Sequence, residues 1–146
     1  MTFLQQQLAA AAAAKPAKPK RKSEEHGFQK TLVELLELIL PADAVVTSID
    51  HANAASVVTG ALRKARGVKK GIPDVWIIWA KPSSVPPAPI IVTLETKATL
   101  GRLDIEQEFW RDALIALGCH WAAPRTLEQA IAAIEAADIP LRGRIL

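Results

Sequence analysis

The spacing of apolar residues predicts a long helix near the start of the chain. Its buried face comes from side chains three or four positions apart: Phe28, Leu32, Leu35, Leu36 and Ile39. Ser23 has the side chain of a helix cap, and Glu24 and Glu25 would complement the positive end of the helix dipole. Because Pro41 lacks a backbone donor, we expect this helix to run from Ser23 to just before Pro41.

Four short stretches rich in apolar and β-branched residues predict strands. They are Ala44–Ile49, Val75–Ala80, Ile90–Thr96 and Cys119–Ala123. The segment between the second and third stretches is rich in proline, so no helix can cross it. These two strands are therefore predicted to pair as an antiparallel hairpin.

Caps and helix breakers predict three further helices, at about Ala55–Arg66, Asp104–Leu117 and Thr126–Ala137. Gly67 and Gly118 would end the first two of them. Thr126 and Gln129 have the spacing of a capping box at the start of the last. The resulting order, α-β-α-β-β-α-β-α, predicts an α/β domain with a small mixed sheet flanked by helices.

Charged residues flank the predicted hairpin at one end. Asp74 precedes the first strand, while Glu95 and Lys97 close the second and project from the same face because they are two residues apart. In an antiparallel hairpin the start of one strand lies beside the end of the other, so these three side chains are expected to meet. Carboxylate oxygens suit a divalent cation such as Mg²⁺. A mutual ion pair, without a metal, is the alternative interpretation.

Composition excludes several classes of protein. The chain has 146 residues, of which 50% are hydrophobic and 23% charged, as expected for one globular domain. Its single cysteine, Cys119, excludes an internal disulfide and a cysteine-based zinc site. No apolar run approaches the roughly 20 residues of a membrane helix, and no GxxxxGK[ST] loop is present. We therefore expect a cytoplasmic protein with no membrane partner and no nucleotide cofactor.

Positive charge is concentrated at the beginning of the chain. Residues 1–22 contain five of the 18 basic residues and no acidic one: Lys15, Lys18, Lys20, Arg21 and Lys22. Pro16 and Pro19 interrupt this segment, so we interpret 1–22 as a flexible basic N-terminal arm and 23–146 as the folded domain. Such an arm fits an anionic polymer such as DNA, or it serves only as a solubilising terminus.

Two short motifs resemble a nuclease signature. The sequence GIPD (Gly71–Asp74) followed by ETK (Glu95–Lys97) resembles the PD-(D/E)XK pattern. Residues 24–36, 51–74 and 96–118 resemble the first helix, the His/Asn-containing segment and the Gln-bearing helix of one branch, the VRR-NUC (virus-type replication-repair nuclease) domain. This domain occurs in small phage-encoded proteins. The resemblance covers residues 24 to about 137 and implies a restriction-endonuclease-like α/β core.

The resemblance also implies roles for individual residues. Asp74, Glu95 and the backbone carbonyl of Thr96 would hold one or two Mg²⁺ ions, for which Mn²⁺ can substitute. Lys97 would orient or deprotonate the attacking water. Gln107 would steady Lys97 or a phosphate.

A further carboxylate is implied on the first helix, where Glu24 and Glu25 are adjacent candidates. Glu25 lies four residues before Gln29 and shares its helix face, which favours Glu25. This carboxylate would reach the metal through water or complete a second metal site.

Candidate nucleic-acid contacts lie mainly in the basic segment before GIPD. Arg63, Lys69 and Lys70 belong to a run of five positive charges in eight residues, which would follow the phosphate backbone or form an ordinary solvated helix end. Arg102, in the Gly-Arg-Leu turn, and His51 are further candidates.

The leading hypothesis is therefore a metal-dependent DNA endonuclease or junction resolvase of a bacterial or phage-infected cell. RNA as the substrate, and linear, flap or branched forms such as the Holliday junction, remain open at this stage. The alternatives are a catalytically silent nucleic-acid-binding subunit and an unrelated α/β interaction domain. Symmetric cutting of two strands would require a homodimer. Its contact, or else part of the core, would be formed by Trp110, Leu114, Leu117 and Trp121.

Overall fold

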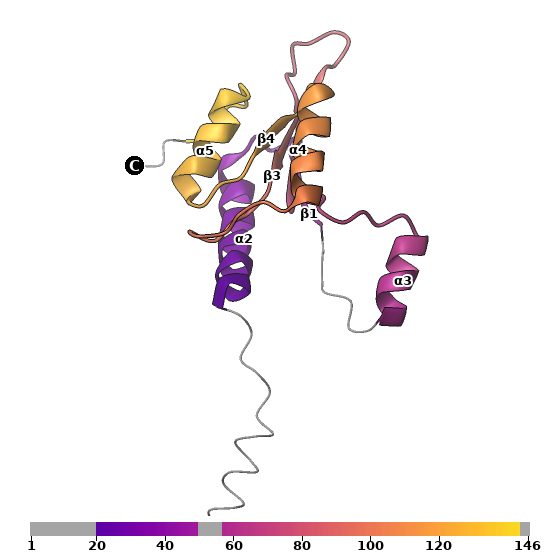
Figure 1. The fold of residues 1–146 in the computed structure, drawn as a ribbon. Coiled ribbons are helices and arrows are strands. Elements are labelled where there is room, and N and C mark those ends of the chain that lie inside the picture. Colours follow the sequence, from indigo (N-terminus) through magenta and orange to yellow (C-terminus); the bar gives the residue numbers. More distant parts are fainter. Residues whose placement is uncertain (1–19, 50–56, 144–146) are drawn as a thin grey trace, which may run out of the picture.

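A computed structural model describes residues 20–49 and 57–143 of the chain (Figure 1). Its elements are α2 (Lys20–Ile39), β1 (Val45–Ser48), α3 (Val57–Ala65), β2 (Val75–Ala80), β3 (Pro89–Leu94), α4 (Ile105–Ala116), β4 (His120–Ala122) and α5 (Leu127–Ala136). This order is the one predicted from the sequence. His51, a candidate nucleic-acid contact, and residues 1–19 of the predicted basic arm lie outside the described residues.

The four strands form one mixed sheet in the order β1-β2-β3-β4. β1 pairs with β2 and β2 pairs with β3 in the antiparallel sense, whereas β3 and β4 are parallel. The predicted hairpin is therefore confirmed. The parallel pair requires a crossover, which α4 supplies between the two strands.

The main core lies on one face of this sheet. Alternate residues of β2 point to that face, and they pack with β3 against α2 and α5. The fully or almost fully buried side chains include Leu32, Leu36, Val75, Ile77, Val92, Leu94 and Ile134. Figure 1 shows the strands between α2 and α5 on one side and α4 on the other. The interleaved residues of β3 and its extension consequently face α4.

The start of α2 differs from the sequence prediction. The described helix already includes Lys20, so Ser23 lies within it and does not cap it, and the first turn of the described span contains no acidic residue. Lys20, Arg21 and Lys22 all have high helix propensity, so nothing in them ends the helix before Ser23. The expected dipole role of Glu24 and Glu25 is therefore wrong, because the dipole effect falls off within the first turn.

The capping box predicted at Thr126 is only half formed. The Thr126 hydroxyl accepts from the Gln129 N–H, but the Gln129 side chain accepts from the Arg125 N–H at 2.8 Å. A complete box stands instead at α4, where Asp104 and Gln107 satisfy each other's backbone N–H groups.

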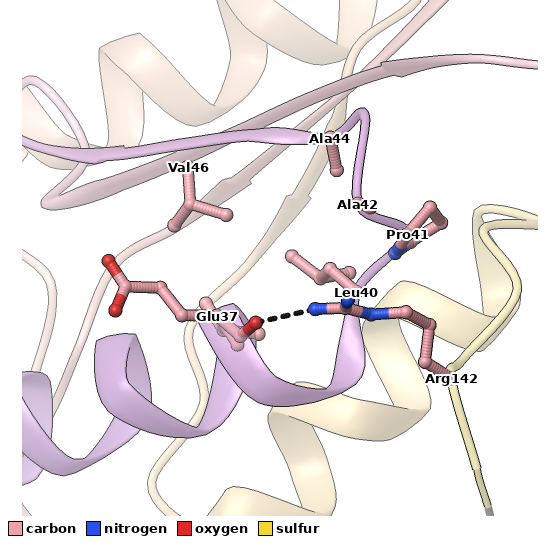
Figure 2. A pocket seen from close by; sticks show the side chains of 8 residues that line it. Glu37, Leu40, Pro41, Ala42, Ala44, Val46 and Arg142 are labelled. Carbon is pink, nitrogen blue, oxygen red and sulfur yellow. Dashed lines mark hydrogen bonds between the residues drawn. The ribbon is translucent and has the colours of Figure 1, made fainter.

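The end of the described chain returns to the C-terminus of α2. The Arg142 N–H donates to the Ile39 carbonyl at 2.6 Å, and the Arg142 guanidinium donates to the Glu37 carbonyl at 2.7 Å. Figure 2 shows this side chain reaching across the rim of a small pocket to α2. The contact satisfies carbonyl groups that the helix itself leaves without partners.

No helix in the described part of the chain is long and apolar enough to cross a lipid bilayer.

Two glycines with positive φ differ in how closely other atoms approach them, and this difference measures how tightly the GIPD loop packs on α4. Gly71 has φ 80°, and a Cβ there would lie 2.6 Å from the Glu106 carbonyl carbon. Gly67 has φ 84°, yet none of the described atoms lies within 4 Å of its position for a Cβ. We expect Gly67→Ala to cost only the backbone term, roughly 1–2 kcal/mol.

Gly71→Ala should cost that term and about 1–3 kcal/mol of overpacking in addition. Urea unfolding of both variants measures the difference. Equal losses of stability would show that the loop does not depend on its close approach to α4.

Candidate active site

Backbone pairing brings the GIPD and ETK motifs to one end of the sheet. Val75 pairs with Leu94, so Asp74 and Glu95, the next residues outward, are neighbours across the hairpin. Regular strand β3 ends at Leu94, earlier than predicted, but the chain stays extended beyond it. The Glu95 N–H donates to the Ala122 carbonyl at 2.9 Å and the Lys97 N–H to the Pro124 carbonyl at 3.3 Å. Glu95 and Lys97 therefore project from the same face, as the sequence predicted.

Glu95, Lys97 and Gln107 form a connected polar cluster. The Lys97 ammonium lies 3.4 Å from Glu95 Oε1 and donates to Gln107 Oε1 at 2.9 Å. Gln107 Nε2 donates in turn to Glu95 Oε1 at 2.5 Å. Glu95 is 3% exposed and Lys97 7% exposed, so two opposite charges are buried and connected by one amide.

Gln107 belongs at once to the helix cap and to this cluster. Its Oε1 accepts from the Asp104 N–H at 3.0 Å and from Lys97, and its backbone N–H donates to Asp104 Oδ1 at 2.9 Å. The capping box fixes the first turn of α4. The same bonds therefore hold the amide against Glu95 and Lys97.

Thr96 orients Asp74 from the opposite strand. Its N–H and its hydroxyl both donate to Asp74 Oδ2, each at 2.8 Å. Thr96 is 2% exposed. The sequence indicated only the Thr96 backbone carbonyl, and these two donors were not predicted. The threonine in the middle of ETK is the signal that could have indicated the hydroxyl.

The structure distinguishes Glu25 from Glu24. Glu25 Oε1 accepts from the Ala98 N–H at 3.3 Å, whereas Glu24 is exposed on α2. A Cβ on Gly101 would lie 3.1 Å from Glu25 Oε1, so this carboxylate is packed against the loop that follows Lys97. Glu25 is thus placed beside the cluster, as the spacing favoured.

Burial makes ionisation of Glu95 costly. It raises the pKa of the Glu95 carboxyl from 4.5 to about 8, with the negative charge of Asp74 acting in the same direction. Lys97 opposes both effects through its charge and its hydrogen bond. Two neighbouring carboxylates with only one ammonium between them form a site that favours an additional positive charge.

The donor set fits a divalent cation that keeps some of its water. Within residues 20–49 and 57–143, no three acidic, histidine or cysteine side chains form a metal-binding group by themselves. The close carboxylates are Asp74 and Glu95, and Gln107 and Lys97 both contact Glu95 at Oε1. Mg²⁺ commonly takes one or two carboxylates and retains several waters, so this pair is sufficient.

The described candidate nucleic-acid residues differ in their exposure. Lys69 and Arg102 are exposed and Arg63 is half-buried. Lys70 pairs with Glu106 at 3.2 Å, and the Lys70 carbonyl accepts from Trp110 Nε1 at 3.0 Å. These two contacts attach the basic segment to α4, beside the catalytic candidates.

The site generates a prediction about stability and pH. The Glu95 pKa is higher in the folded protein than its ordinary value of 4.5, so protonation favours folding. In EDTA, the stabilisation of the folded protein by the protonated Glu95 carboxyl is complete below pH 4.5. It is lost as the pH rises towards 8. We expect Glu95→Gln to become progressively more stable than the wild type over this interval, by up to a few kcal/mol.

Urea unfolding at pH 5, 6, 7 and 8 measures this difference. Glu34→Gln is the matched control, because Glu34 is exposed. Its ion pair with Lys30, one helical turn before it at 4.0 Å, is a surface pair that contributes little to stability. A stability difference between wild type and Glu95→Gln that does not change with pH would contradict the environment described for Glu95.

Comparison with known families agrees with this arrangement. The family model described as the VRR-NUC domain matches residues 10–125, most of the 146-residue chain. No curated protein and no solved structure gave a significant match. The α/β fold with its four-stranded mixed sheet is consistent with the PD-(D/E)XK architecture expected from the sequence. The chain belongs to the VRR-NUC domain family, which implies a nuclease-type function.

Proposed function

We propose that this protein is a Mg²⁺-dependent endonuclease that hydrolyses phosphodiester bonds of DNA. The observation that carries the proposal is the buried Glu95 next to the half-buried Asp74 and beside Lys97, at the end of the β2–β3 hairpin. Mn²⁺ is expected to substitute for Mg²⁺, since both accept carboxylate oxygens.

Each group of the site has a chemical role in this proposal. Asp74, Glu95 and the Thr96 carbonyl would hold the cation, and Glu25 would contribute a further carboxylate beside it. The cation supplies Lewis acidity and lowers the pKa of a bound water. The Thr96 N–H and hydroxyl keep Asp74 in one orientation, at 2.8 Å each. Glu95 would need to be ionised to serve as a ligand, and its proton would go to solvent.

Lys97 acts on the reacting phosphate rather than on the metal. Its ammonium has three hydrogens, and its contacts with Gln107 and Glu95 direct two of them. The third is available to orient the attacking water or to offset negative charge that develops on the phosphorane. Gln107 holds Lys97 through its Oε1 and Glu95 through its Nε2. Hydrolysis then leaves a phosphate monoester and a free hydroxyl.

DNA is held by charges around the site. Lys69 and Arg102 are exposed, and Lys70 and Arg63 belong to the same basic segment as Lys69. Contacts of this kind follow the phosphate backbone without reading bases, and their strength falls with salt. They therefore suit recognition of DNA shape better than recognition of a fixed base sequence.

A catalytically silent subunit would have no chemical need for this set of groups. Burying Glu95 beside Asp74 is unfavourable unless a function requires both carboxylates. The arrangement therefore favours an active enzyme over a binding subunit with the same fold.

The direct test compares cleavage of labelled linear, flap and four-way DNA in Mg²⁺, in Mn²⁺ and in EDTA. We expect cleavage only with a metal. The cleavage rate should fall more than about a hundredfold in Asp74→Asn and in Glu95→Gln, since each substitution removes a metal ligand. Asp112→Asn is the control, because Asp112 is exposed on α4 and pairs with Arg111. Binding of DNA by wild type without cleavage of any substrate would favour the silent subunit.

We further propose that the active form is a homodimer that prefers branched DNA. One chain carries one site, and symmetric cutting of two strands requires two sites related by a two-fold axis. Of the four candidate contact residues, Leu114 is 5% exposed and belongs to the core, which is the alternative that the sequence left open. Leu117 is 80% exposed and remains available, together with Ile115 at 53%.

Light scattering at micromolar concentration, combined with rates on linear and four-way substrates, tests this part. We expect twice the chain mass and faster cutting of the four-way substrate. Leu117→Lys should shift the protein towards monomer, because it places a charge in an apolar contact. A wild-type monomer that cuts both substrates equally would exclude both the dimer and the branch preference, and would leave the nuclease activity established.

A further inference from the structure

The loop that connects Lys97 to α4 is held by a residue far along the chain. Residues Ala98–Gly101 carry no strand or helix, yet Ala98 is 5% exposed and Gly101 is also buried. Thr99 and Leu100 between them are exposed, so only the two ends of the loop are buried, and backbone carbonyls at buried ends need partners. The Gly101 N–H donates to the Ala98 carbonyl at 2.9 Å, and Arg125, in the segment between β4 and α5, supplies further donors.

The guanidinium of Arg125 donates to three carbonyl groups of this loop. Nη1 donates to the Ala98 oxygen at 2.5 Å and to the Thr99 oxygen at 3.2 Å, and Nη2 donates to the Gly101 oxygen at 2.6 Å. Within the described part of the chain, no carboxylate pairs with Arg125. The bonds therefore fix backbone, and they do not neutralise a charge.

Arg125 is itself held in place by bonds on both sides. Its own N–H donates to Gln129 Oε1 at 2.8 Å. The residue before it, Pro124, accepts from the Lys97 N–H at 3.3 Å and is fully buried. The same short segment thus binds Lys97 through its backbone and three of the next four residues through the Arg125 side chain.

The loop in turn packs against two functional side chains. The Ala98 N–H donates to Glu25 Oε1 at 3.3 Å. A Cβ on Gly101 would lie 3.1 Å from the same oxygen and 3.3 Å from Lys97 Cδ. The space between Arg125 on one side and Glu25 and Lys97 on the other is therefore filled by the loop, and a shift of the loop would displace both side chains.

We propose that Arg125 is a positioning residue of the nuclease site, which fixes the Ala98–Gly101 loop and through it the Lys97 ammonium and the Glu25 carboxylate. This inference rests on the proposed function. The planar fork of arginine suits several carbonyls at once, whereas a lysine ammonium is a compact charge that cannot span them. Arg125→Lys therefore keeps the charge and removes the geometry.

The experiment compares Arg125→Lys and Arg125→Ala with wild type. Arg142→Lys is the matched control, since Arg142 also binds a backbone carbonyl, that of Glu37 at the far end of α2 from Glu25 (Figure 2). We expect single-turnover cleavage at saturating protein to fall roughly 10–100-fold in both Arg125 variants, the usual effect of removing a supporting contact. The affinity of Arg125→Lys for DNA and its salt dependence should equal those of wild type.

Hydrogen exchange provides a readout that does not require cleavage. In Arg125→Lys we expect faster exchange at the Ala98 and Gly101 amides, with the amides of α5 unchanged. Circular dichroism establishes that each variant is folded, and Arg125→Lys remains informative if Arg125→Ala fails to fold. In Arg142→Lys, exchange of the Ala98 and Gly101 amides and cleavage should both match wild type.

Three results would overturn the proposal. One is unchanged exchange at Ala98 and Gly101 in Arg125→Lys. Another is an Arg125→Ala variant that cuts at the wild-type rate at saturating protein but binds DNA more weakly. If the slope of its log affinity against log salt concentration is also reduced by about 1, Arg125 is a phosphate contact. The third is an equal loss of activity in Arg142→Lys, which would indicate a general effect on stability. If wild type cuts no substrate, the proposed function fails first, whatever the exchange results show.

Discussion

The burial of Glu95 is the constraint on which the rest of the site depends. A carboxylate that is 3% exposed, next to a second carboxylate, is unstable as an anion unless positive charge and hydrogen-bond donors surround it. Lys97 supplies the charge and Gln107 supplies a donor. Both must then be held in place, because a buried ion pair contributes to stability only when its geometry is good. The ordering of α4 and of the loop before it follows from this need.

The start of α4 illustrates how one residue meets two requirements. Helix α4 needs partners for its first N–H groups, and the Glu95–Lys97 pair needs an amide between them. Gln107 meets both, through the capping box with Asp104 and through its bonds to the buried pair. A helix end is a rigid support for such a group, since its backbone is already fixed. The fold and the chemistry are therefore coupled at this residue.

The sequence predicted the elements well because their signals are local. Period and β-branching located the strands, and the proline-rich segment implied the hairpin that brings Asp74 to Glu95. The N-cap of α4 was also correct at Asp104. The predicted start of α2 at Ser23 was wrong. A serine is only one of several residues at which a helix can begin, and the lysines and arginine before it extend a helix readily. Two side chains that the sequence did not indicate, those of Thr96 and Arg125, act through tertiary contacts. The Thr96 hydroxyl and the Arg125 guanidinium bind groups 22 and 24 to 27 residues away, and no local pattern records such pairs.

The topology of the sheet explains why Arg125 can reach the loop at all. β4 runs parallel to β3, so both strands finish at the same end of the sheet. The antiparallel strand β2 begins at this end. Three chain segments consequently meet at that end: the GIPD loop before β2, the ETK segment after β3 and the Pro124–Arg125 segment after β4. An antiparallel β4 would have delivered Arg125 to the other end. The crossover through α4 is what makes the parallel pairing possible, so the helix that carries Gln107 also determines that Arg125 arrives beside the loop leading into that helix.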